Sequence, residues 1–214
     1  RIGSAEAELQ VNQMLHLDIP IPQGVIKVIS KEDRYSTAVN LFENYHNNNG
    51  HFDKVIIASG EDSPTAFLGS SLSSKIGLPI LLTRRDSLPD ITANTLKQHG
   101  VKQAIAIGSQ NHISDHVFSS IEKIIGTFPQ RVSAETYNEI ANILYCSFPQ
   151  TESQVAILTY PNCTADLLSL TPFIAQNKVP VFYHVENGII GKQTLEILTS
   201  GIFKQILILG GQTS

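Results

Sequence analysis

Two stretches of this chain, Asp53-Lys-Val-Ile-Ile-Ala-Ser-Gly60 and Ser153-Gln-Val-Ala-Ile-Leu-Thr-Tyr160, share one pattern at a distance of about one hundred residues. Each contains a short apolar run, which is typical of a parallel strand buried on both faces. The gap from Thr65 to Pro79, where the next apolar run begins, equals the gap from Asp166 to Pro180. Landmarks repeated in order and at matched spacing predict a tandem repeat, so function should be inferred from the repeating unit and its assembly.

Each unit is expected to alternate strands with helices. Apolar runs at 25–29, 54–58, 79–82 and 103–107 predict four strands in the first unit, and helical periodicity lies between them. Strands that are apolar throughout and alternate with helices indicate a three-layer α/β module with a short parallel sheet.

The repeat divides the chain into three parts. We predict a tail helix of a preceding repeat, or an N-terminal arm, at 1–24; a complete repeat at 25–128; and a second repeat at 129–214 that lacks its final helix. The N-terminal part resembles the end of a unit because Ile2-Gly3-Ser4 matches Ile107-Gly108-Ser109.

Polar residues before the periodic segments predict where helices begin. The expected helix starts are Ser30 or Asp33, Asp62 with Ser63 and Pro64, Ser87 or Asp90, and Ser114. In the second unit, Asp166 is expected to cap a helix.

Composition excludes several classes of protein. The chain is 42% hydrophobic and 16% charged, which favours globular units over disorder. Its net charge of -4 gives no general attraction to nucleic acid or to an acidic membrane surface. No apolar run approaches the roughly 18 residues of a membrane span. Cys146 and Cys163 are expected to be ordinary thiols, with a disulfide or a metal site as the alternative.

Three motifs follow one another in a recognisable order. They are Asp33-Arg34-Tyr35-Ser36-Thr37-Ala38, then Pro79-Ile80-Leu81-Leu82-Thr83, and a glycine pair after the third strand, present as Gly210-Gly211 and weakened to Gly108-Ser109. Together they resemble the cell wall binding repeat 2 family, which occurs in tandem on surface proteins of Gram-positive bacteria. The resemblance covers nearly the whole chain.

The chain resembles a divergent member of that family. Thr65 stands where the family has an aspartate that Asp166 retains, and Arg131 keeps a strand arginine that Val28 lacks. In the second unit the first motif has diverged to the stretch 135–140.

The resemblance implies a fold and a function. The units of that family resemble Toprim-like or flavodoxin-like α/β modules, and three such units pack as a triangle. It implies a non-catalytic, extracellular module without a cofactor, which anchors a secreted surface protein to an anionic polymer of the cell wall, a teichoic acid or a polysaccharide. The motif residues that carry the resemblance are Tyr35, Thr37, Ala38, Thr65, Pro79, Leu81, Leu82, Gly108, Asp166, Pro180, Gly210 and Gly211.

Six basic residues are candidate contacts for such a polymer. Arg34 lies near a helix start, where Lys27 and Lys31 are close in sequence, and Arg131 is the retained strand arginine. Arg84 and Arg85 follow a strand, and open parallel sheets bind ligands beyond the carboxyl ends of their strands. The alternatives are an inter-unit hydrogen bond for Arg34 and a solvated loop for Arg84 and Arg85. Tyr35 and Tyr137 are expected to pack with a bonded hydroxyl.

An enzyme is disfavoured by motifs that are missing from the sequence. A Toprim-type metal enzyme needs a glutamate after its first strand and a later Asp-x-Asp, but only Glu61-Asp62 hints at the first. A nucleotide-binding Rossmann enzyme needs Gly-x-Gly-x-x-Gly, which this sequence does not contain. The histidines are scattered; His112 and His116 could share a helix face as metal ligands, although solvent exposure is the expected state.

A scaffold that has lost polymer binding is the second hypothesis. A polymer binder should gather its Lys and Arg residues in one groove, whereas a scaffold should scatter them. A large exposed apolar face would indicate a neighbouring repeat or a homo-oligomer. The polymer, the attached effector domain and the pairing of the cysteines stay open at this point.

Overall fold

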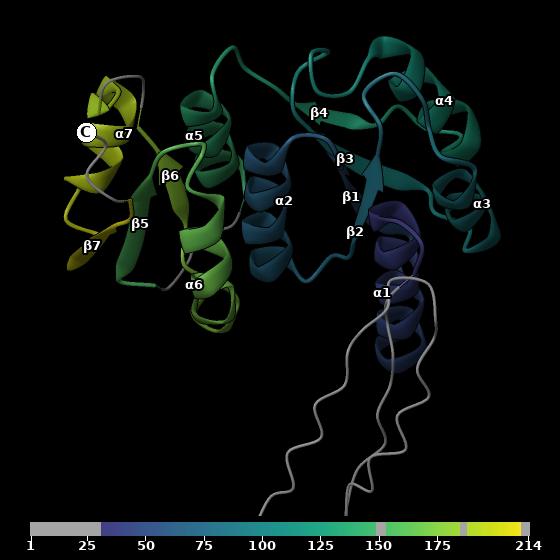
Figure 1. Ribbon diagram of the computed structural model, residues 1–214, viewed down its shortest axis with the longest axis horizontal. Coiled ribbons are helices and arrows are strands. Elements are labelled where there is room, and N and C mark those ends of the chain that lie inside the picture. The colour runs from purple at the N-terminus through teal and green to yellow at the C-terminus, as the bar shows by residue number, and fades with distance from the viewer. Residues whose placement is uncertain (1–30, 149–152, 185–187, 211–214) are drawn as a thin grey trace, which may run out of the picture.

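Figure 1 shows a computed structural model that describes residues 31–148, 153–184 and 188–210. Lys27, the strand expected at 25–29, the parts expected at 1–24, and Gly211 lie outside the described residues. Helices and strands alternate, as expected. The helices are α1 (Arg34–Asn49), α2 (Ser63–Ile76), α3 (Asp90–Gln98), α4 (Asp115–Ile125), α5 (Tyr137–Ser147), α6 (Thr164–Asn177) and α7 (Lys192–Leu198). The strands are β1 (Lys54–Ser59), β2 (Ile80–Thr83), β3 (Gln103–Ile107), β4 (Gln130–Val132), β5 (Val155–Thr159), β6 (Val181–Tyr183) and β7 (Gln205–Ile208).

The strands form two parallel sheets that repeat one topology. The first has the order β2-β1-β3-β4 and the second the order β6-β5-β7. Ile56 on β1 pairs with Ile80 and Ile105, and Ile157 on β5 pairs with Val181 in the same way. The expected α/β fold of tandem modules is confirmed.

Strand β4 joins the sheet that precedes it. The second repeat predicted at 129–214 would contain β4, yet β4 pairs with β3 through Ile105–Gln130 and Ile107–Val132. Residues 133–136 then lead to α5, which packs against β6 of the other sheet. The boundary between the two sheets therefore lies one strand later in the chain than the predicted boundary between the repeats.

Side-chain caps begin three of the helices where the sequence predicts. Asp33, Asp62 and Ser114 cap α1, α2 and α4, each accepting a hydrogen bond from a backbone N–H of the first turn. Helix α3 begins at Asp90. Thr136 and Glu139 form a reciprocal capping box on α5.

The expectation that Asp166 caps a helix is wrong. Cys163 occupies the N-cap position of α6, without a side-chain cap bond, and Asp166 lies in the first turn. The Cys163 thiol donates a hydrogen bond to Asp166, with 2.9 Å between Sγ and Oδ2. Burial raises the pKa of this thiol, and the bond to Asp166 acts in the same direction. Cys146 is exposed and Cys163 is buried; both are free thiols.

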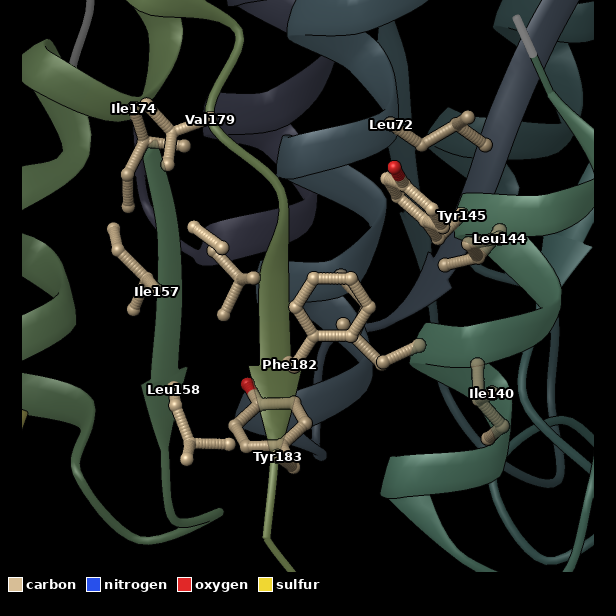
Figure 2. Close-up of a cluster of buried hydrophobic side chains, with 14 of the residues drawn as sticks. Leu72, Ile140, Leu144, Tyr145, Ile157, Leu158, Ile174, Val179, Phe182 and Tyr183 are labelled. Atoms are coloured by element: carbon tan, nitrogen blue, oxygen red, sulfur yellow. The ribbon is translucent and has the colours of Figure 1, made fainter. Parts of the chain in front are cut away.

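Two apolar cores hold the molecule together. One lies under α1, α3 and α4 on one face of the first sheet, with Phe42, Leu96 and Val117 among its members. The other joins the remaining face of that sheet, through α2, to the second sheet and α5. Figure 2 shows Leu72 of α2 close to Tyr145 of α5 in this second core. Helix α2 therefore connects the two units.

None of the helices in the described ranges has the length and apolar composition that crossing a bilayer requires.

Candidate functional site

Three of the predicted arginines meet at the carboxyl edge of the first sheet. Arg34 begins α1, and its Nη1 donates a hydrogen bond to the carbonyl oxygen of Gly60, directly after β1. Arg84 follows β2 and places its guanidinium 5.2 Å from the ring centroid of Tyr35. Arg85 is the next residue, and all three arginines are exposed. The carboxyl ends of β1 and β2 are adjacent because these strands pair, which brings residues distant in sequence together.

The packing of Tyr35 requires a glycine at position 60. Tyr35 is buried, and a Cβ atom built on Gly60 would lie 2.7 Å from its Cε1. Real Cβ atoms essentially never approach so closely, so any side chain at this position would displace the ring. Tyr35 thus acts as the expected packing residue and as the platform under Arg84.

The loop after β2 is tied to its neighbours. The backbone N–H of Arg85 donates to Oε2 of Glu61 at 2.9 Å, and its carbonyl oxygen accepts from the N–H of Ser114 at 2.9 Å. These bonds connect the loops that follow β1, β2 and β3. The Arg85 side chain itself is exposed and lies 3.7 Å from Asp86. An exposed ion pair of this kind contributes little to stability, so the guanidinium is available to a ligand.

Acidic residues are interspersed with the basic ones at this edge. Lys31 is exposed, and its backbone N–H donates to Oγ1 of Thr37. Asp33 accepts a bond from the N–H of Ser36, and this bond, with a smaller effect from Arg84, lowers the pKa of its carboxyl group. Because carboxylates stand between the cations, the edge offers separate positive positions and not a uniformly positive surface.

Arg131 lies apart from the other arginines and is largely engaged within the protein. It belongs to β4, at the sheet edge opposite β2, three strand spacings or about 14 Å away. Its guanidinium donates to the carbonyl oxygen of Ile113 at 2.8 Å and to Asp115 at 3.0 Å, and covers the ring of Phe118 at 4.3 Å. Burial lowers the pKa of Arg131, although Asp115 acts in the opposite direction. These contacts hold β4 against the start of α4.

The corresponding position in the second unit faces inward. Thr136 caps α5 as Asp33 caps α1, so Tyr137 stands where Arg34 stands in the first unit. The Tyr137 hydroxyl donates to Oδ1 of Asp62 at 2.7 Å. Burial and this carboxylate raise the pKa of Tyr137 far above its usual value.

This cap-based correspondence corrects the motif alignment from sequence, which placed Tyr137 opposite Tyr35. Tyr35 is buried, Tyr137 is partly buried against the second core, and the hydroxyl of Tyr137 has the expected bond. No local pattern revealed the contact with Asp62, because that residue precedes Tyr137 by most of a repeat.

The glycine after the third strand of each unit has a structural role. Gly108 and Gly210 have φ angles of 115° and 137°, a region that favours glycine. A Cβ atom on Gly108 would lie 2.8 Å from His112, and one on Gly210 would lie 2.5 Å from Tyr160. Both glycines therefore permit a tight turn.

Other motif residues lie mostly in the interior. Buried positions include Ala38, Thr65, Pro79, Leu81 and Pro180, whereas Thr37 and Leu82 are partly buried. These residues build the modules and are not accessible to a polymer.

Histidines that are distant in sequence meet at the end of α1. His46 and His99 have ring centroids 4.5 Å apart, Nε2 of His46 lies 3.3 Å from Nδ1 of His51, and His99 pairs with Glu43 at 2.7 Å. These residues lie in separate segments of the sequence, where they were expected to be scattered. His112 precedes α4, so it does not share a helix face with His116. Within the described ranges, no group of three or more His, Cys, Asp or Glu residues is arranged to hold a metal ion.

Comparison with known families identifies one match within the chain. Residues 29–118 match the family described as Cell wall binding domain 2 (CWB2).

Two curated relatives come from Bacillus subtilis (strain 168). The protein named amidase enhancer is 35% identical over 122 residues, which are 56% of this chain and 16% of that protein. The N-acetylmuramoyl-L-alanine amidase LytC is 27% identical over 119 residues, 54% of this chain and 22% of the enzyme. The chain thus corresponds to less than a quarter of either relative.

Two solved structures from Clostridium difficile share the fold. Cwp6 superposes with a TM-score of 0.75 at 20% identity, covering 87% of this chain and 29% of Cwp6. Cwp8 gives a TM-score of 0.67 at 20% identity, covering 86% of this chain and 35% of Cwp8.

Proposed function

We propose that this chain, whose residues 29–118 belong to the Cell wall binding domain 2 family, is a non-catalytic module that holds a surface protein on an anionic polymer of the cell wall. The observation that carries the proposal is the convergence of Arg34, Arg84 and Arg85 on one exposed edge of the first sheet. This edge lies within the residues that match the family. The location of the module would be the cell wall, as the name of the family implies.

The geometry suits weak contacts with successive anionic groups of a polymer. Guanidinium groups bind phosphate and carboxylate through planar pairs of N–H donors. Arg84 and Arg85 present their guanidinium groups from a loop whose backbone is held by Glu61 and Ser114, so little order has to be gained on binding. Lys31 would add a fourth positive charge at the start of α1.

Arg131 is proposed as a positioning residue, because its guanidinium already binds Ile113, Asp115 and Phe118. Lys27 remains a proposed contact on the basis of its place in the sequence alone. The second unit has Tyr137 at the position of Arg34, so the proposed polymer contacts belong to the first unit.

The test is co-sedimentation of the 214-residue chain with isolated cell walls across a series of salt concentrations. One wall sample keeps its anionic polymers and the other has had them removed. We expect binding that disappears when the polymers are removed and weakens as salt rises, because exposed charge pairs are screened. Protein that is shown to be folded but binds neither sample would overturn the proposal.

A scaffold without polymer affinity is the second candidate, and one observation favours it. Asp33, Glu61 and Asp86 lie among the arginines, so the edge has little excess positive charge. Binding to walls that is equal before and after polymer removal, and insensitive to salt, would support a protein or glycan partner instead.

A further inference from the structure

The contact between the two units is made by a helix that fills a groove. Helix α2 of the first unit lies against α5 and α6 of the second. Its residues Leu68 and Leu72 pack between Leu144 and Tyr145 of α5 and Val181 of β6. The remaining cavity at this contact is only about 20 Å³, so the groove of the second unit is filled.

In the first unit, none of the described residues fills the same groove. Because Asp33 and Thr136 are corresponding N-caps, Leu41 corresponds to Leu144 and Phe42 to Tyr145. Leu41 and Phe42 line an open groove of about 390 Å³ between α1, β2 and the end of α2.

The exposure of the groove residues follows from this difference. Leu41 is 51% exposed, whereas Leu144 is 6% exposed. Tyr45, one helical turn after Leu41, is 44% exposed and also lines the groove. All the residues lining the groove are uncharged, which favours an apolar occupant.

The second unit carries an exposed counterpart of the helix that fills such a groove. The N-caps Asp62 and Cys163 correspond, and so do the C-caps Gly77 and Lys178, which aligns α6 with α2. Phe173 on α6 then stands at the position of Leu72. Phe173 is 37% exposed, whereas Leu72 is 3% exposed.

Helix α6 cannot fill the groove of its own chain. It packs against α2, and Thr171 and Ile174 line a small cavity there together with Phe67 and Ser71. The open groove is lined by the last turn of α2 and by α1, on a different side of α2. Figure 1 shows α6 and α1 separated by α2.

We propose that a second copy of this chain inserts its α6, with Phe173 at the centre, into the open groove between α1 and α2. The new contact would repeat the contact that already joins the two units. It is head-to-tail, because it joins the second unit of one copy to the first unit of another. A head-to-tail dimer leaves one groove and one α6 face open, so longer assemblies can form at higher concentration.

Sedimentation velocity with two complementary variants tests this contact. Leu41→Glu blocks the groove but leaves α6 intact, and Phe173→Glu does the reverse. Ile91→Glu is the matched control, since Ile91 is also exposed but lies on α3, outside the groove. All three positions are exposed, so folding should be retained, and circular dichroism would verify this for each variant.

We expect wild type and Ile91→Glu to associate as concentration rises, whereas each blocking variant alone stays monomeric with at least about a hundredfold weaker association. An equimolar mixture of Leu41→Glu and Phe173→Glu should form a 1:1 dimer and nothing larger, since it holds one intact groove and one intact α6 face. Wild-type protein that stays monomeric at high concentration, or a mixture that forms no dimer, would overturn the proposal. Monomeric wild type would leave the groove to a further repeat within a longer chain. Wall binding is not part of this readout, so its failure would not affect the outcome.

Discussion

Helices α1 and α5 occupy the same place in their units but have different surroundings. Leu41 and Leu144 are the same residue at corresponding positions, yet the first is mostly exposed and the second is buried. The difference arises because α2 covers α5, while none of the described residues covers the equivalent face of α1. In a tandem array, the burial of a residue is therefore set by the adjoining unit as well as by its own.

The starts of these two helices differ in residue type as well. Arg34 extends over the edge of the first sheet, whereas Tyr137 turns toward Asp62 of the neighbouring unit. One position thus serves ligand binding in the first unit, as we propose, and unit assembly in the second.

The largest expected effect on stability distinguishes the buried Leu144 from the exposed Leu41. Replacing the buried Leu144 with Ala should lower the free energy of unfolding by about 3 kcal/mol, because it removes apolar contacts and leaves a cavity. Leu41→Ala is the matched control and should cost less than about 0.5 kcal/mol. Urea unfolding at low protein concentration, where copies do not associate, measures both. Equal effects would show that α2 does not cover α5 as described.

A smaller effect is expected at the contact between Tyr137 and Asp62. Tyr137→Phe removes a hydrogen bond to a carboxylate and should cost about 2 kcal/mol in the free energy of unfolding.

The same substitution should change how stability depends on pH. The folded-state pKa of Tyr137 is raised above its usual value of about 10, so its contribution is complete below pH 10 and is lost as pH rises above it. The Phe variant should show a flatter loss of stability in alkaline solution. The pKa of buried Tyr183 is also raised, so the stability of both proteins still falls as the pH rises in alkaline solution. Identical alkaline profiles for wild type and variant would argue against the contact.

The smallest stability effect concerns the capping box of α5. Thr136→Ala should lower the free energy of unfolding by about 1 kcal/mol, since the Thr136 hydroxyl accepts from the N–H of Glu139. Ser133→Ala, in the exposed linker before α5, is the control and should change stability by less than about 0.5 kcal/mol. Thermal unfolding distinguishes the two variants. An unchanged unfolding midpoint for Thr136→Ala would show that the cap does not stabilise α5.

Local patterns predicted most of the fold. The buried strands β1 and β3 were recognised from continuous apolar runs, and three helix starts from their capping residues Asp33, Asp62 and Ser114. These signals are local, because a buried strand needs apolar residues and a helix end needs hydrogen-bond partners close in sequence.

Pairings between distant segments were not predictable in the same way. Strand β4 has the same appearance whether it pairs with its own unit or the preceding one, so sequence could not assign it. The convergence of His46, His51 and His99 likewise depends on how α1 and α3 pack. Arg84 and Arg85 were predicted as candidate contacts because the carboxyl edge of a parallel sheet is a general binding position. Their contacts with Tyr35 and Glu61 required the structure.

The most direct test of the proposed function compares two opposite edges of the first sheet in the wall co-sedimentation assay. The double variant Arg84→Gln/Arg85→Gln removes two charges at the carboxyl edge. The control Lys97→Gln/Lys102→Gln removes two exposed charges near the start of β3, at the other edge. We predict that the arginine variant binds walls at least about tenfold more weakly, while the lysine variant binds like wild type. Equal loss in both variants, or wild-type binding by the arginine variant, would contradict an anchor that acts through this edge.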